Sequence, residues 1–85
     1  MATLNRHAGE GTLTFSGYRE SVIYDFQSDP KLTTGKGSVT GGAEELRAAF
    51  KSGYARLKLE SGRDVPVTVV AHSEGGDRAW FEIGG

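Results

Sequence analysis

Hydrophobic and polar residues alternate along two stretches of the chain, and a Ser-Gly pair interrupts each stretch. The first covers residues 13–26 around Ser16-Gly17, and the second covers residues 57–69 around Ser61-Gly62. Side chains of a strand point alternately to its two faces, and a short glycine-containing segment turns the chain, so both stretches predict β-hairpins. In the first hairpin we expect strands at about 12–16 and 18–27.

The segment between the hairpins predicts one helix. Gly42 breaks the preceding segment, Glu44 and Glu45 fall in the first turn, Lys51 falls in the last turn, and Gly53 follows. Such charges complement the helix dipole, and a glycine just past the end suits a left-handed cap. Four apolar residues fall on one face at helical spacing: Ala43, Leu46, Ala49 and Phe50.

Downstream of the helix, alternation predicts a three-strand antiparallel meander at about 55–59, 65–71 and 79–83, and a weaker strand signal precedes the helix at 36–40. The expected order is therefore strand, strand, weak strand, helix and three strands. This order predicts an α+β fold in which an antiparallel β-hairpin, one helix and a meander form a sheet or a partly closed small barrel. Pro66 cannot donate a ladder hydrogen bond, so it indicates an edge strand or a bulge.

Length and composition limit the classes to consider. An 85-residue chain predicts a single small domain, which we expect at residues 12–85, after a polar, flexible tail at residues 1–11. The chain has no cysteine, so disulfides and thiolate metal sites are excluded. Its apolar runs are too short to span a membrane, and residues 1–11 lack the apolar core of a secretory signal, so we expect a cytoplasmic protein.

Charge and motifs argue against several activities. Ten basic and eleven acidic residues give a net charge of −1, which makes nucleic-acid binding unlikely from charge alone. Gly35-Lys36 fails as a phosphate loop, because Pro30 stands where a glycine is required and Gly37 stands where a serine or threonine is required. A glycine-rich segment at residues 33–42 that leads into a helix could still bind an anion.

Catalytic and metal-binding patterns are missing from the sequence. His72, Glu74 and Asp77 cluster near one turn, but zinc usually takes more imidazole or thiolate ligands than His7 could add. The carboxylates and serines form no recognisable nucleophile or acid-base arrangement. We therefore expect no enzyme activity, no catalytic residue, no cofactor, no metal and no small-molecule substrate.

Three apolar residues fall on the polar side of their strands: Ile23, Val70 and Trp80. One interpretation is that the helix covers this side through Leu46 and Phe50. The other is that the side chains stay exposed and form a contact surface, because apolar clusters on small domains often mark interfaces. On this basis we expect a protein–protein interaction or assembly module that binds a protein partner or self-associates.

The C-terminus offers an alternative function. A terminal Gly84-Gly85 after a final strand resembles ubiquitin-like proteins and the small β-grasp sulfur carriers. In those families the free glycine carboxylate is activated on a slim, flexible tail. The resemblance implies that Gly85 is the activated residue and that Gly84 is its spacer.

A further alternative rests on element order, since the expected order up to the final strand resembles the three strands, helix and two strands of an oligonucleotide-binding (OB) barrel. Such barrels bind single strands through stacking aromatics and a basic groove. The residues that could serve this role are Tyr18, Tyr24, Tyr54, Arg19, Arg56, Lys58 and Arg63.

Overall fold

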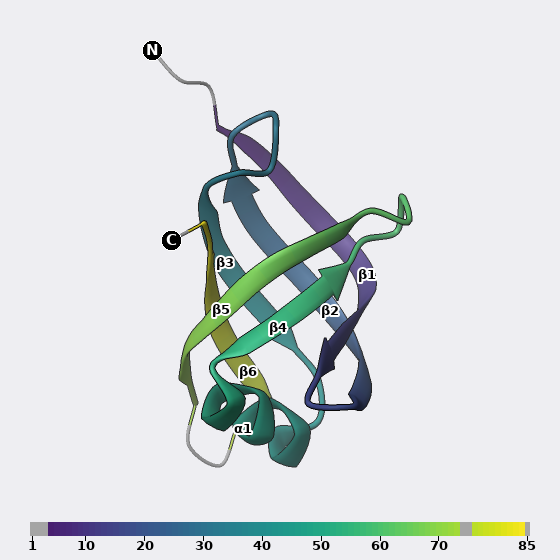
Figure 1. The fold of residues 1–85 in the computed structure, drawn as a ribbon, viewed down its shortest axis with the longest axis vertical. Coiled ribbons are helices and arrows are strands. Elements are labelled where there is room, and N and C mark those ends of the chain that lie inside the picture. Colours follow the sequence, from purple (N-terminus) through teal and green to yellow (C-terminus); the bar gives the residue numbers. More distant parts are fainter. Residues whose placement is uncertain (1–3, 74–75, 85) are drawn as a thin grey trace.

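The computed structural model describes residues 4–73 and 76–84, which form six strands and one helix (Figure 1). In chain order the elements are β1 (Asn5–Phe15), β2 (Tyr18–Ser28), β3 (Gly35–Thr40), α1 (Ala43–Ser52), β4 (Tyr54–Lys58), β5 (Asp64–His72) and β6 (Arg78–Ile83).

The strands form one closed barrel in the order β1-β2-β3-β6-β5-β4, and every neighbouring pair is antiparallel. A short ladder between β1 and β4, over Thr12–Thr14, closes the ring. The small, mostly antiparallel fold with one helix agrees with the prediction, but the barrel is fully closed. Closure depends on β1 reaching β4 across more than forty intervening residues, which strand periodicity does not reveal.

The first predicted hairpin turn is confirmed. Ser16 and Gly17 have φ values of 46° and 84°, and the strands continue without interruption from the pair Phe15–Tyr18. Two positive φ values in a two-residue loop match the right-handed twist of paired strands, and glycine adopts them without steric cost. In the second hairpin the turn is wider, and Gly62 (φ 89°) contributes the left-handed residue.

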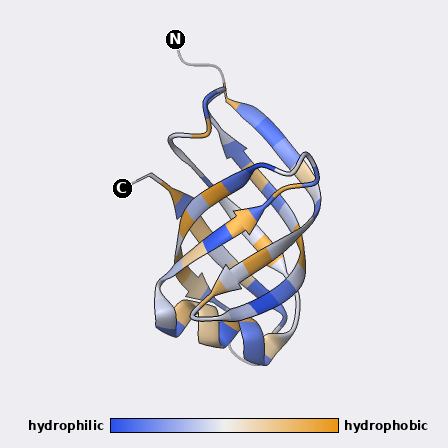
Figure 2. Cartoon of the chain, turned by 45° about the vertical axis from the view of Figure 1, so that its right-hand side comes forward, coloured by the Kyte–Doolittle hydropathy of each residue, from blue (hydrophilic) through white to orange (hydrophobic). Residues whose placement is uncertain are grey.

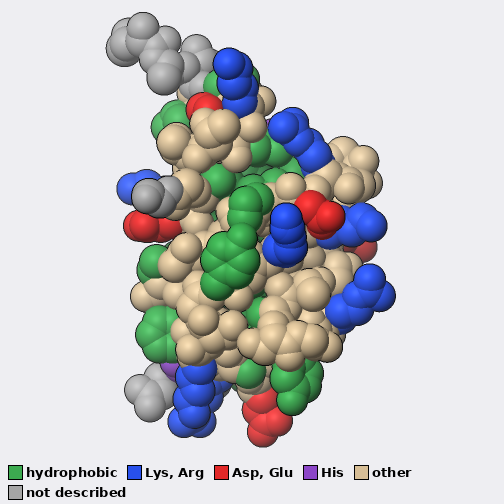
Figure 3. All heavy atoms as spheres, in the orientation of Figure 1, with side chains coloured by type: hydrophobic (Ala, Val, Ile, Leu, Met, Phe, Trp, Pro, Cys, Tyr) green, Lys and Arg blue, Asp and Glu red, His purple; other side chains and the backbone are tan. Residues whose placement is uncertain are grey.

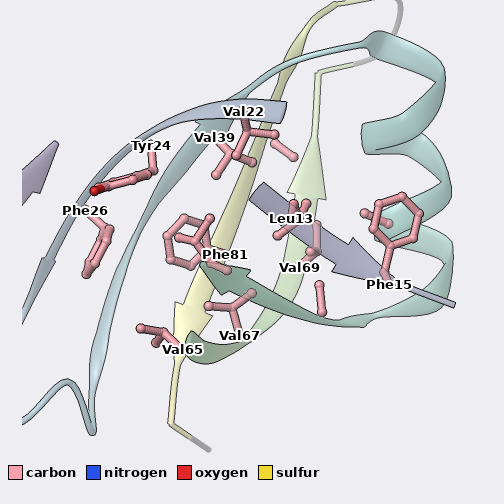
Figure 4. Packing of buried hydrophobic residues seen from close by; sticks show 14 of the residues in the cluster. Leu13, Phe15, Val22, Tyr24, Phe26, Val39, Val65, Val67, Val69 and Phe81 are labelled. Atoms are coloured by element: carbon pink, nitrogen blue, oxygen red, sulfur yellow. The ribbon is translucent and has the colours of Figure 1, made fainter. Parts of the chain in front are cut away.

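The barrel interior contains the inward-facing side chains of the strands. In Figure 2 these apolar positions alternate with polar ones along the strands. Phe26 and Phe81 meet edge-to-face with ring centroids 5.7 Å apart, and both point inward in Figure 4. Gly37 lies between them on β3, opposite both residues. A side chain at Gly37 would collide with Phe26, so the glycine allows the two rings to meet.

The helix closes one end of the barrel (Figure 1). Leu46 and Ala49 are buried in the core, and the N–H of Gly53 donates to the Ala49 carbonyl at 2.9 Å, as the predicted glycine cap requires. The interpretation that Leu46 and Phe50 cover the polar side of the strands is wrong. The helix covers a barrel end, and Phe50 stays partly exposed against the ring of His72.

One sequence expectation needs correction, and another is met locally. The first strand begins at Asn5, well before the predicted start near Thr12, because residues 5–11 pair in continuous register with β2. Pro66 agrees with the predicted edge position, because the start of β5 pairs with β4 only, although the rest of β5 has neighbours on both sides. It pairs with Arg56 on β4, and the register with β6 begins only at Val67, so its missing N–H disrupts no ladder bond to β6.

Candidate functional site: an open strand edge

The two halves of β1 have different surroundings. Residues 5–15 pair with β2 along their whole length, but only Thr12–Thr14 also pair with β4. Within residues 4–73 and 76–84, no second strand pairs with residues 5–11. In Figure 1 this half of β1 extends beyond the end of β4. An edge of this kind presents backbone N–H and C=O groups to a further strand.

The backbone groups at this edge can be identified from one hydrogen bond. The N–H of Glu10 donates to the Glu60 Oε1 at 3.1 Å, and Glu60 follows β4, so this N–H points away from β2. Every second residue of a strand directs its backbone groups to the same side. The N–H groups of Arg6 and Ala8 therefore face the open edge as well.

Glu60 covers one end of the edge. Its N–H donates to the Tyr24 hydroxyl at 3.2 Å, which holds the residue beside β1. Its carboxylate lies against Gly9, where an added Cβ would come within 2.8 Å of the carboxyl carbon. The side chain thus occupies the Gly9–Glu10 stretch and leaves the stretch around Ala8 uncovered.

Charged side chains flank this edge on the outer face. The Arg6 guanidinium donates to both carboxylate oxygens of Asp25 on β2, at 3.0 and 2.8 Å. These hydrogen bonds lower the pKa of Asp25, with a smaller contribution from the charge of Arg78. They also raise the pKa of Arg6. The ion pair directs the Arg6 guanidinium over β2.

Ile23, Val70 and Trp80 are all exposed, at 57%, 45% and 40%, but they do not form one cluster. Trp80 on β6 pairs with Ser38 on β3, whereas Ile23 on β2 pairs with Thr40 on β3. Ile23 and Trp80 are therefore separated by β3 and lie at different positions along it. On its other side Ile23 pairs with Glu10 of the open edge. Figure 3 likewise shows hydrophobic side chains reaching the visible face in separate spots between charged ones.

Val70 and Trp80 lie together because of an irregularity in β5. Val69 pairs with Phe81 and Ala71 pairs with Trp80, which leaves Val70 as the extra residue of a β-bulge. A bulge turns two successive residues toward one side of the sheet. Val70 and Trp80 consequently line a shallow hollow of about 180 Å³ on the outer face.

In the structure, the C-terminal glycines resemble a carrier tail less closely than they do in the sequence. Gly84 (φ 84°) packs so closely on the backbone of Thr33 that an added Cβ would collide with the Thr33 carbonyl, and Gly85 lies outside the described residues. The β-grasp arrangement pairs the first strand with the last in parallel. Across the described strands, β6 pairs with β3 and β5, both antiparallel.

The residues considered for an OB barrel do not all share one surface. Tyr24 is buried, and Arg63 lies on the turn after β4, where it donates to the Lys31 carbonyl at 3.5 Å. Tyr18 and Tyr54 are exposed. The remaining three residues line one hollow on the outer face: Arg19, Arg56 and Lys58.

The glycine-rich segment is not a loop over most of its length. Gly35–Thr40 forms β3 and pairs on both sides. At the start of the helix, the N–H of Gly42 donates to the Glu20 Oε2 at 3.3 Å, and the Glu45 carboxylate also lies against Gly42. The protein's own carboxylates therefore occupy the position that an anion would take.

Residues 4–73 and 76–84 contain no group of three His, Asp or Glu side chains that could hold a metal, and Glu74 lies outside this part of the chain. It contains no helix with the length and apolar character needed to cross a membrane.

Comparison of the chain with protein-family models, curated proteins and solved structures finds no match in any of the three.

The sequence did not indicate the open edge. Residues 5–11 are polar or small, so they lack the apolar alternation that marks a half-buried strand. A weak signal was present, since His7, Gly9 and Gly11 alternate with Arg6 and Glu10. Only pairing with β2 makes that alternation visible as a strand.

Proposed function

We propose that this protein is a non-catalytic interaction module that self-associates by antiparallel pairing of the β1 edge with the same edge of a second copy. The observation that carries the proposal is the one-sided pairing of residues 5–11. Strand addition to an exposed edge is a common mode of polypeptide recognition, in which main-chain hydrogen bonds supply much of the affinity. A two-fold axis through such a pair makes the contact self-complementary.

Charge complementarity favours a second copy as the occupant. In an antiparallel pair centred on Ala8, Arg6 lies opposite Glu10 of the other copy, and Glu10 lies opposite its Arg6. Opposite charges directly across a ladder are favourable. At the centre, the small Ala8 side chains leave room for the two backbones to approach. The contact is short, so we expect a weak dimer with a Kd of about 10 µM to 1 mM.

Glu60 regulates access to the edge in this proposal. Its carboxylate already accepts the Glu10 N–H, which a partner strand would also need. Binding of a second copy therefore requires Glu60 to swing away, and the hydrogen bond opposes dimerisation. Removing the carboxylate should strengthen self-association.

The test is sedimentation equilibrium or light scattering over a wide concentration range. The wild type should form a concentration-dependent dimer, and Ala8→Pro should abolish it, because proline removes the central N–H. Ala8→Gly keeps that N–H and is the matched control, which should still dimerise. Glu60→Ala should lower the Kd by about threefold to tenfold, as expected for one competing hydrogen bond.

The contrary outcomes are distinct. A monomer in both the wild type and Glu60→Ala would overturn the proposal. A dimer that survives Ala8→Pro, with the melting temperature showing that the variant folds, would also overturn it and move the contact elsewhere.

The Val70–Trp80 surface is a second candidate for such a contact, favoured by the bulge that turns Val70 toward Trp80. Trp80→Asp should leave a β1-mediated dimer intact. If Trp80→Asp dissociates a dimer that survives Ala8→Pro, this second surface carries the association.

A further inference from the structure

We infer that the outer face over β2, β1 and β4 holds a binding site for the phosphate monoester of a small organic ligand. Strand register brings the key residues together. Thr14 pairs with Arg19 on one side and with Arg56 on the other. All three side chains point outward, and the two arginines stand about 10 Å apart at their Cα atoms, two strand spacings.

The next row adds a third cation and a second hydroxyl. Thr12 pairs with Lys58, and both residues line the same hollow as Arg19 and Arg56, about 520 Å³ in volume. The hollow thus offers two guanidinium groups and an ammonium group around two threonine hydroxyls. Arginine forks and hydroxyl donors match the three acceptor oxygens of a phosphate group.

The cations of this hollow outnumber its carboxylates. Asp64 lies at its rim opposite Lys58 in the strand register. However, the one ion pair in residues 4–73 and 76–84 joins Arg6 and Asp25, outside the hollow. Three cations against one carboxylate leave a local positive charge in a protein whose net charge is −1. A bound dianion would relieve the repulsion among them.

The extent of the cluster indicates a compact ligand rather than a nucleic-acid strand. Glu10 precedes Thr12 on the same face of β1, and Asp64 borders the hollow at β5, so carboxylates interrupt the positive surface on these two sides. A polyanion needs cations along its length, whereas one phosphate group needs only this cluster. Beyond Arg56 the row continues to the exposed Pro66, and Tyr54 is 58% exposed two residues away, which provides apolar surface for the organic part of the ligand.

The test is a titration followed by amide NMR at constant ionic strength, with inorganic phosphate, adenosine monophosphate and a single-stranded oligonucleotide as separate probes. We expect saturable shifts at Thr12, Thr14 and Lys58 with the mononucleotide, and a Kd of about 1 mM or lower. Free phosphate should shift the same amides but bind more weakly. Arg56→Gln should weaken mononucleotide binding at least about tenfold.

Arg47→Gln is the matched control, because Arg47 is an exposed arginine on the helix, away from this hollow. It should change the Kd less than about twofold. Two results would overturn the inference: no saturable shift with either phosphate probe, or equal weakening by Arg47→Gln and Arg56→Gln. Tighter binding of the oligonucleotide, with a steep loss of affinity in salt, would replace the phosphomonoester with nucleic acid.

Discussion

The two halves of β1 belong to one strand and share one neighbour, β2, but they differ in what lies on their other side. At Thr12–Thr14 the backbone also pairs with β4, and Leu13 between them is 1% exposed in the core. At residues 5–11 no second strand pairs with the backbone, and the groups that lie against it are the Glu60 carboxylate and, at Gly11, the Lys58 carbonyl. One half therefore closes the barrel and stabilises the fold, while the other is available to a partner.

Truncation of an apolar side chain should give the largest difference in stability between the two regions of β1. Leu13→Ala removes a buried side chain where the barrel closes, and should lower the free energy of unfolding by about 2–5 kcal/mol. Leu4→Ala is the matched change just before the open half, where the leucine is 59% exposed. It should cost less than about 0.5 kcal/mol. Urea unfolding measures both, and similar losses would contradict the division.

Two glycines on β1 test the boundary between the halves. A Cβ on Gly11 would collide with the Lys58 backbone carbonyl and press on the Tyr24 ring, whereas on Gly9 it meets only the end of the Glu60 side chain. Gly11→Ala should therefore cost about 1–3 kcal/mol by overpacking. Gly9→Ala should stay within about 0.5 kcal/mol of the wild type, because a flexible side chain can move aside. Equal thermal shifts would mean that β4 does not restrict β1 at Gly11.

Removal of a buried polar atom from the open half should have a smaller effect, and this effect should be stabilising. The ring of His7 in the open half stacks on Phe26 at 4.8 Å, and its Nε2 is buried with no hydrogen-bond partner. His7→Phe keeps the stack and removes the unsatisfied nitrogen, so it should raise the free energy of unfolding by about 1 kcal/mol at neutral pH. A loss of stability would indicate that Nε2 has a partner in solution.

The smallest effect should come from the exposed ion pair. Because Arg6 lowers the pKa of Asp25 below its ordinary value of 3.8, the pair contributes stability above about pH 4, and this stability is lost as the pH falls through the lowered pKa. Asp25→Asn should therefore be slightly less stable than the wild type at pH 7 and equal to it at the lowest pH. Unfolding curves at several pH values measure the difference, and a pH-independent gap would contradict the assignment.

The sequence by itself determined the local structure. Alternation predicted the hairpins, the positions of Ser16-Gly17 and Gly62 predicted their turns, and the helix followed from its end charges and Gly53. These features depend on neighbouring residues, so their physical causes are readable along the chain. The period of two placed Ile23, Val70 and Trp80 on the outer side of their strands, but only the structure showed that the helix leaves them exposed.

Only the tertiary structure decided which distant residues share a surface. Pairing with β2 turned a polar, glycine-containing segment into a strand, and the short ladder with β4 left half of that strand open. The same register brought Arg19 and Arg56 to either side of Thr14, although they are far apart in the sequence. Barrel closure sets these juxtapositions through long-range hydrogen bonds, and no local pattern encodes them.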